Sequence, residues 1–325
     1  MSRSGQGNAR AAPRGPTRRR LLAAAGLAAS AVVLAACDAW SLVARTDALR
    51  PGGSPFTIEA LRARRYAPGE IRLRNVVQRV DAYTSYLMTY KSDGLQLTGV
   101  ATIPGGSGPF PVVVLNHGFA LPARYHSGEG TRAMADALSR RGFITLASDY
   151  RGMGGSEDDA AINPGVRLDF AIDVLNLVAA IPSLPEAGPP PIGMWGHSLG
   201  SDVALRTAEV SDAVGPVAVW APVSAWMDDI ASYYRIPTSS RSAQLRAALS
   251  PGNFLEFLTG PVTIHQGDAD RAVRPEWAVR LQAALQAEGV NSELLVYPGL
   301  GHLLGLDAQV VVRQTASFFQ TALDA

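Results

Sequence analysis

A serine between two glycines is the residue in this sequence whose setting first suggests chemistry. Ser198 is the centre of a G-x-S-x-G pentapeptide that runs from Gly196 to Gly200. An apolar run at 191–195 precedes it, and an alanine-rich run with helical spacing follows at 201–210. A sharp turn from strand to helix strains the backbone and holds a serine hydroxyl clear of the sheet, and glycines leave room for it. We therefore predict that Ser198 is a nucleophile.

A serine hydroxyl is a poor nucleophile until an oriented base accepts its proton. The chain has five histidines. His302 lies in a glycine-rich loop after the last predicted strand, and such a loop brings an imidazole over the carboxyl edge of a sheet. His117 directly follows an apolar strand, and His197, inside the serine turn, is expected to point away from the hydroxyl. The position of His302 predicts that it is the base.

The third member of such a constellation is a carboxylate that fixes the tautomer of the histidine and stabilises its charged form. Asp268 and Asp270 both follow the apolar run at 261–265 directly. Either aspartate can also close the turn into the next helix. Spacing alone leaves this choice open.

Apolar runs alternate with amphipathic runs along the chain, as expected when strands alternate with helices. Predicted strands lie at 83–90, 95–103, 111–115, 143–147, 192–195, 215–220, 261–265 and 293–297. Predicted helices lie at 128–141, 166–180, 201–210, 275–289 and 307–323. The alternation predicts an α/β fold with a mostly parallel central sheet and helices on both faces, in one catalytic domain that covers 76–325.

One interval of the predicted domain, 222–259, breaks this alternation. It holds Trp226, Tyr233 and Tyr234 among polar residues, between two predicted strands. An insertion of this length either forms a small helical lid over the site or packs as ordinary helices on the sheet. The sequence leaves both interpretations open.

From about residue 86 onward the chain resembles the α/β-hydrolase superfamily, and within it the prolyl-oligopeptidase-like and dienelactone-hydrolase-like enzymes. The features that carry the resemblance are the His117-Gly118 turn, the segment 149–156 (DYRGMGGS), the pentapeptide around Ser198 and the pattern Gly267-x-x-Asp270-x-x-Val273. The chain order serine, aspartate, histidine is also that of this superfamily.

The resemblance assigns further roles at the site. It implies that Asp270 is the acid and that Asp268 is a turn residue, although Gln266 stands where these enzymes usually carry glycine. It also implies an oxyanion hole, made of the backbone N–H groups of Leu199 and Phe119, with His117 and Gly118 supporting the turn.

The first 37 residues are predicted to be a signal peptide. A basic segment at 17–20 fits the twin-arginine export pattern, and the uncharged stretch at 21–36 is short for a bilayer span. It ends in Leu-Ala-Ala-Cys37, which resembles the bacterial lipobox, whose cysteine is acylated. An ordinary cleaved signal and an uncleaved anchor helix are the alternatives. The resemblance implies an exported protein, lipid-anchored to the outer face of the cytoplasmic membrane or in the periplasm, with residues 38–75 as a tether.

Composition excludes several function classes. With a net charge of +1, the chain lacks the basic excess of a nucleic-acid binder. Cys37 is its only cysteine, so no disulfide forms within the chain. There is no H-E-x-x-H motif, no phosphate-binding loop and no dinucleotide fingerprint, so we expect no metal and no cofactor.

The sequence thus predicts an exported serine hydrolase that cleaves a small carboxylic ester through an acyl-enzyme intermediate. A prolyl-oligopeptidase-like peptidase is the first alternative. About 45 residues between Cys37 and the first convincing strand are too few for the propeller that such peptidases generally carry. A binding lipoprotein without chemistry on the same fold is the second alternative.

Overall fold

The computed structural model describes residues 54–159, 168–305 and 308–323. The predicted signal peptide, the predicted lipidation site Cys37 and the first part of the predicted tether therefore lie outside the described residues, as do the first residues of two predicted helices.

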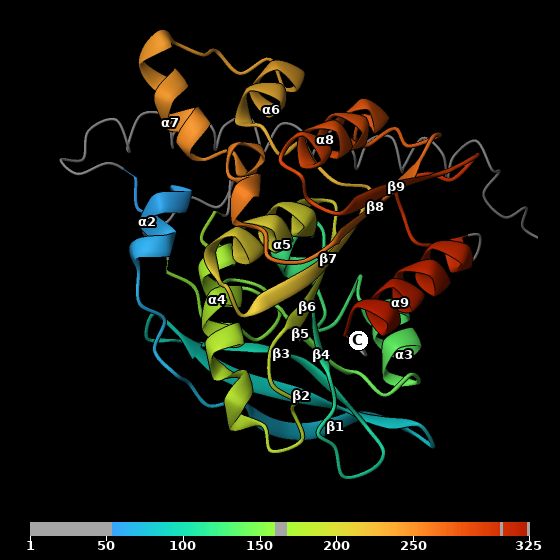
Figure 1. Ribbon diagram of the computed structural model, residues 1–325. Helices are drawn as coiled ribbons and strands as arrows, with labels where there is room; N and C mark the ends of the chain where they lie inside the picture. Colours follow the sequence, from blue (N-terminus) through green and yellow to red (C-terminus); the bar gives the residue numbers. More distant parts are fainter. Residues whose placement is uncertain (1–53, 160–167, 306–307, 324–325) are drawn as a thin grey trace, which may run out of the picture.

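The described strands form one nine-stranded sheet in the order β1-β2-β3-β5-β4-β6-β7-β8-β9 (Figure 1). They are β1 (Arg72–Val80), β2 (Tyr83–Ser92), β3 (Leu95–Pro104), β4 (Val112–Asn116), β5 (Ile144–Ser148), β6 (Ile192–His197), β7 (Val214–Trp220), β8 (Val262–Gly267) and β9 (Ser292–Tyr297). Strands β1, β2 and β3 pair antiparallel, as do β3 and β5, whereas every neighbouring pair from β5 to β9 is parallel. The parallel strands end at one edge of the sheet, and their loops gather there.

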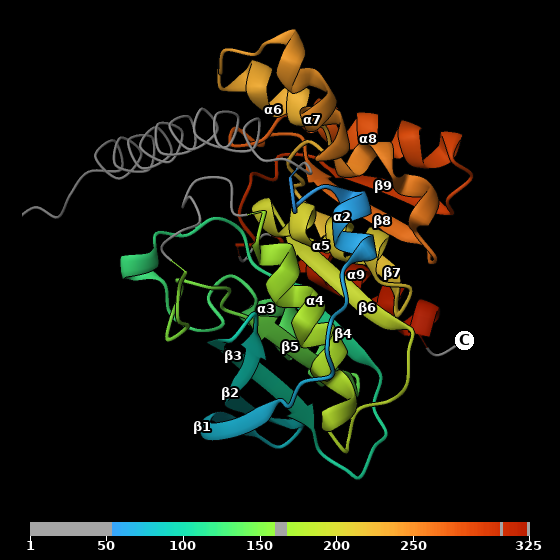
Figure 2. The same cartoon turned by 90° about the vertical axis from the view of Figure 1, so that its left-hand side faces the viewer.

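Helices cover both faces of this sheet, as predicted (Figures 1 and 2). They are α2 (Ile58–Ala63), α3 (Arg132–Ser139), α4 (Phe170–Ala180), α5 (Leu199–Val210), α6 (Met227–Tyr233), α7 (Ala243–Ala248), α8 (Pro275–Ala287) and α9 (Gln309–Leu323). Helices α4, α5 and α8 bury apolar side chains in one core cluster, and α3 and α9 do so in the other. Among the described helices, none has the length and apolarity needed to cross a bilayer.

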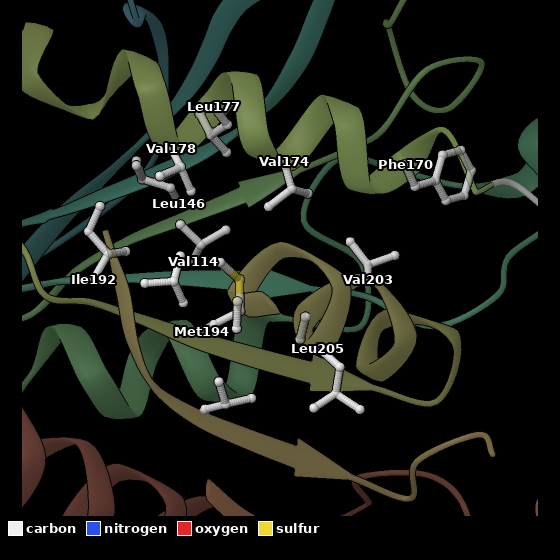
Figure 3. Close-up of a cluster of buried hydrophobic side chains, with 14 of the residues drawn as sticks. Val114, Leu146, Phe170, Val174, Leu177, Val178, Ile192, Met194, Val203 and Leu205 are labelled. Carbon is white, nitrogen blue, oxygen red and sulfur yellow. The ribbon is translucent and has the colours of Figure 1, made fainter. Parts of the chain in front are cut away.

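The central strands are apolar on both faces because both core clusters pack against them. All five residues of β4 are buried. Val114 and Met194 of neighbouring strands contact the cluster that holds Val174 and Leu177 of α4 (Figure 3). Continuous apolar runs are typical of parallel strands covered on both sides, and these runs made the strands predictable.

Two elements differ from the sequence-based prediction. Strand β1 begins at Arg72, inside the segment predicted as a tether, and most of its side chains are exposed. As the outermost strand it lacks the apolar alternation by which strands are recognised. Helix α3 begins at Arg132 rather than at 128. Gly128 and Gly130 adopt positive φ angles of 77° and 81°, which a right-handed helix does not allow, so the helix starts after them.

The insertion at 222–259 is helical and is partly built into the core. Met227 and Ile230 of α6 are buried in the cluster that contains Trp277 of α8. The indole N–H of Trp226 donates to Asn253 Oδ1 at 3.1 Å, which joins the two ends of the insertion. Helices α6 and α7 stand at the end of the molecule opposite β1 (Figure 1).

Helix α2, the first helix in the described residues, packs on α5 (Figure 2), and a buried carboxyl group lies at this contact. Glu209, in the last turn of α5, is fully buried, and among the described residues neither of its carboxyl oxygens has a hydrogen-bond partner. The Arg62 guanidinium of α2 hydrogen-bonds the backbone carbonyl of Glu209 rather than its side chain. Burial raises the pKa of Glu209 well above its ordinary value, although the charge of Arg206 opposes the shift.

This raised pKa makes stability fall as pH rises. Above the ordinary carboxyl pKa of 4.5 the unfolded chain loses the Glu209 proton while the folded chain keeps it, so the free energy of unfolding decreases. We expect Glu209→Gln, which needs no proton, to raise Tm at pH 8 by about 2–4 °C, roughly 1 kcal/mol. At pH 4 the difference should shrink.

Thermal unfolding followed by circular dichroism at both pH values measures this effect. Glu288→Gln, at an exposed glutamate after α8, is the matched control and should leave Tm unchanged. A Glu209→Gln variant that is less stable than the parent at pH 8 contradicts the interpretation, because it would mean that the folded protein uses the ionised carboxylate.

Candidate active site

The turn between β6 and α5 holds Ser198 in a strained backbone conformation. Its φ of 54° and ψ of −120° lie in a region that residues other than glycine rarely adopt. A Cβ atom at Gly196 would lie 2.2 Å from the carbonyl oxygen of Gly200, and one at Gly200 would lie 2.1 Å from that of Asn116. Only glycine fits at either position, so these two residues allow the tight turn that presents the serine.

Three loops at the carboxyl edge of the sheet bring Ser198, His302 and Asp270 together. His302 Nε2 lies 2.9 Å from Ser198 Oγ, and His302 Nδ1 lies 2.8 Å from Asp270 Oδ2. The serine follows β6, the aspartate follows β8 and the histidine follows β9. In this arrangement Nδ1–H donates to the carboxylate, which leaves Nε2 free to accept the serine proton.

The surroundings of Asp270 favour its ionised form. Its Oδ1 accepts hydrogen bonds from the backbone N–H groups of Ala272 at 2.8 Å and Val273 at 3.1 Å. Burial alone raises its pKa, but the hydrogen bond and charge of His302, together with these two N–H groups, outweigh burial and hold the pKa below its usual value. The side-chain amide of Gln266, the residue that departs from the family pattern, lies 3.4 Å from Oδ2.

Asp268, the other candidate acid, is exposed, and the His302 ring is hydrogen-bonded to Asp270 instead. Its Oδ1 accepts the backbone N–H of Gly299 at 2.7 Å, and the backbone N–H of Ala269 donates to the carbonyl of Leu300 at 3.0 Å. Asp268 thus ties the loop after β8 to the loop that carries His302.

The backbone of His302 is held by two buried side chains that the sequence analysis did not assign. The ring Nε2 of His197 and the indole Nε1 of Trp220 each donate to the His302 carbonyl oxygen at 2.9 Å. Burial, and next the neighbouring His302, lower the pKa of His197 to about 3, so its ring is neutral. His197 therefore faces the histidine loop, and the two donors set where His302 stands relative to Ser198.

His117 orients the turn that passes over the serine. Its ring is stacked between Tyr125 and Tyr150, and its Nδ1 lies 2.7 Å from the carbonyl oxygen of Gly118. That carbonyl and the N–H of Phe119 belong to one trans peptide group, so the N–H points away from the His117 ring. A Cβ at Gly118 would lie 3.2 Å from Ser198 Cβ, which puts this peptide next to the serine.

The second predicted oxyanion donor begins a helix. Leu199 is the first residue of α5, and its N–H is one of those that have no acceptor within their own helix. The positive end of the helix dipole lies at this point. Among the described residues, no three or more His, Cys, Asp or Glu side chains are grouped as metal ligands would be.

Comparison with known protein families matches residues 130–325 to the prolyl oligopeptidase family. The chain belongs to this family. Human protein ABHD12B is 29% identical over 215 residues, and esterase EstD of Thermotoga maritima is 31% identical over 129 residues. These matches cover 60% and 39% of the chain but only 56% and 30% of the two relatives, so the chain spans about half or less of their length.

Solved structures with the same fold include esterases and peptidases. Acetyl xylan esterase 1 from Thermoanaerobacterium has a TM-score of 0.63 at 20% identity, with 81% of this chain and 92% of that chain covered. Est1E from Butyrivibrio proteoclasticus has 0.60 at 20%, with 73% and 100% covered, and the acylaminoacyl peptidase of Pyrococcus horikoshii has 0.61 at 17%, with 75% and 42% covered. These likenesses show an α/β-hydrolase fold, and the prolyl oligopeptidase family is one of serine hydrolases.

The two aspartates of the loop after β8 give a matched pair of variants. We expect Asp270→Asn to lower kcat by about 10³- to 10⁴-fold, because an amide disturbs the histidine tautomer without changing the shape of the site. Asp268→Asn keeps an acceptor oxygen for the Gly299 N–H and should lower kcat less than about threefold. Steady-state hydrolysis of a chromogenic ester measures both, and the opposite ranking would mean that Asp268 is the acid.

The hydrogen bond from His197 to the His302 carbonyl should matter for turnover. His197→Phe removes one of its two donors, and we expect kcat to fall about 10- to 100-fold because the imidazole is less well placed. His197→Gln, which keeps a donor, should recover part of the loss.

His265→Phe is the matched control for this prediction. His265 is likewise buried, with a pKa lowered by burial to about 3, but its ring bonds Tyr297 and Thr315 instead of the His302 loop. Both phenylalanine variants should lose thermal stability, yet only His197→Phe should lose turnover per folded molecule. An equal loss of turnover in both would show that His197 acts through stability alone.

Proposed function

We propose that this chain is a serine hydrolase that cleaves carboxylic esters, with Ser198 as nucleophile, His302 as general base and acid, and Asp270 as the carboxylate that orients the histidine. The observation that carries the proposal is the continuous path of hydrogen bonds from Ser198 Oγ through the His302 ring to Asp270, at 2.9 and 2.8 Å.

In the first half of the proposed reaction, Ser198 Oγ attacks the ester carbonyl carbon while His302 Nε2 takes the serine proton. The carbonyl oxygen becomes an oxyanion, which the backbone N–H groups of Phe119 and Leu199 stabilise, each by a few kcal/mol. His302 then gives its proton to the departing alcohol, and the acyl group stays on the serine. In the second half, water loses a proton to His302 and attacks the acyl carbon, the bond from that carbon to Ser198 Oγ breaks, and His302 returns the proton to the serine oxygen as the acid leaves.

The ionised state of Asp270 supports this cycle. His302 becomes positively charged each time it takes a proton, and a carboxylate at 2.8 Å stabilises that charge. The lowered pKa of Asp270 keeps the carboxylate charged throughout the neutral range. His197 and Trp220 meanwhile hydrogen-bond the backbone carbonyl of His302. The His302 ring therefore stays in position while it accepts and releases the proton.

An ester is preferred to a peptide as substrate because several similar proteins are esterases. Esterase EstD of Thermotoga maritima is similar in sequence, and acetyl xylan esterase 1 and Est1E are similar in fold. Peptidase activity remains the second candidate because the family itself is named for an oligopeptidase.

Labelling with a fluorophosphonate, read by mass spectrometry, tests the nucleophile. We expect a single adduct on Ser198 in the purified protein and none in Ser198→Ala, because only an activated serine attacks the probe at a useful rate. A panel of 4-nitrophenyl esters and matched peptide anilides then compares the two substrate classes, and kcat/KM should favour the esters by at least about 100-fold.

Each outcome of these two measurements has a distinct meaning. No adduct on a protein that circular dichroism finds folded contradicts the serine mechanism and favours a binding protein on a hydrolase fold. An adduct with anilides cleaved faster than esters contradicts the substrate class and leaves the nucleophile in place.

A further inference from the structure

We propose that the ester substrate carries an apolar acyl chain of several carbon atoms, which lies against Phe119, Leu121 and Leu303. These three residues are called the apolar collar here. The inference rests on the proposed function, because it names the class of ester that the Ser198 site takes.

The collar stands out among the exposed side chains of the protein. In the described part of the chain, seven large apolar side chains are exposed, and three of them are Phe119 at 44%, Leu121 at 48% and Leu303 at 73%. Single exposed apolar residues are normal on a protein surface, whereas several at one place mark a binding site. These three belong to the two loops that flank the nucleophile.

The contacts of the neighbouring residues place the collar around Ser198. Gly118, directly before Phe119, lies against Ser198. Leu303 directly follows His302, whose ring is hydrogen-bonded to Ser198 Oγ. Residues 117–121 belong to no helix or strand, Leu121 has extended backbone angles, and residues two apart on an extended segment point to the same side. Phe119 and Leu121 therefore share one side of the loop.

Other apolar residues of the same two loops pack inward against the core. The exposure of the three collar residues is therefore not needed to anchor the loops. Ala120, between Phe119 and Leu121, packs against one core cluster, while Leu300 and Leu304 of the histidine loop pack against the other. Each loop is thus already anchored to the core by residues outside the collar. Leu303, the most exposed of the seven, stays in water until something apolar covers it.

An acyl chain is the occupant that this position favours. The acyl carbon bonds Ser198 in the proposed intermediate, and both loops of the collar adjoin Ser198, so a chain that extends from this carbon is within reach of the collar. Each methylene that leaves water on binding strengthens the interaction about fourfold. The collar would then select for chain length, with acetate esters too short to reach it and octanoate esters long enough.

Chain-length dependence tests this proposal. The ratio of kcat/KM for 4-nitrophenyl octanoate to that for the acetate is measured below the micelle concentration for the parent protein, Leu121→Ser, Leu303→Ser and the double variant. We expect the parent to prefer octanoate and the double variant to lose about 10-fold of that ratio. Val77→Ser removes an equally exposed apolar side chain (54%) from the outermost strand β1 and should leave the ratio unchanged.

Fluorophosphonate labelling of Ser198 in each variant keeps this proposal separate from the proposed function. An unchanged ratio in a double variant that is still labelled overturns the collar, while the absence of ester turnover and labelling in the parent overturns the proposed function. The third outcome is that the parent elutes as a dimer on size exclusion, the double variant elutes as a monomer and the ratio is unchanged. That result would mean that the collar is a contact surface for a second copy of the chain, and it also overturns the proposal.

Discussion

The site depends on how closely three backbone segments approach one another at Ser198. The end of β4, the end of β6 and the start of α5 meet where Gly200 lies against the carbonyl of Asn116 and Gly196 against that of Gly200. A single methyl group at either glycine would overlap backbone atoms, and backbone cannot rotate aside as a flexible side chain can. The contact therefore sets the angle at which α5 leaves the sheet and, with it, the strained conformation of the serine.

Around this turn, hydrogen bonds to backbone carbonyl and N–H groups hold the polar residues of the site in position. The carbonyl of His302 is bonded by His197 and Trp220, the carbonyl of Gly118 by His117, and the carboxylate of Asp270 by two N–H groups of its own loop. Burial keeps the rings of His117 and His197 neutral by lowering their pKa values. The ring of His197, whose centroid lies 4.9 Å from that of His302, is thus neutral and places no second charge beside it.

The sequence predicted the parts of this protein that have a local signature. The apolar run of β4 and the glycine-flanked turn are visible within ten residues, and the fold class followed from their alternation with helices. Strand β1 was missed because it is an edge strand with exposed side chains. The role of His197 was missed because its partner lies 105 positions away, and no local pattern records a side chain bonded to a distant carbonyl. Ser198 and His302 were named from their local settings, whereas the choice between Asp268 and Asp270 depended entirely on the resemblance.

The hydrogen bonds of the site have a consequence for how the chain acquires activity. The bond between Ser198 and His302 spans 104 positions, that between Trp220 and His302 spans 82, and that between Asp270 and His302 spans 32. Closing such long loops is costly in entropy and occurs late, after local contacts have formed. A nascent or partly folded chain that has already built its first strands and the serine turn still lacks His302 beside Ser198, so the proposed catalytic residues come together only when β9 and its loop have docked.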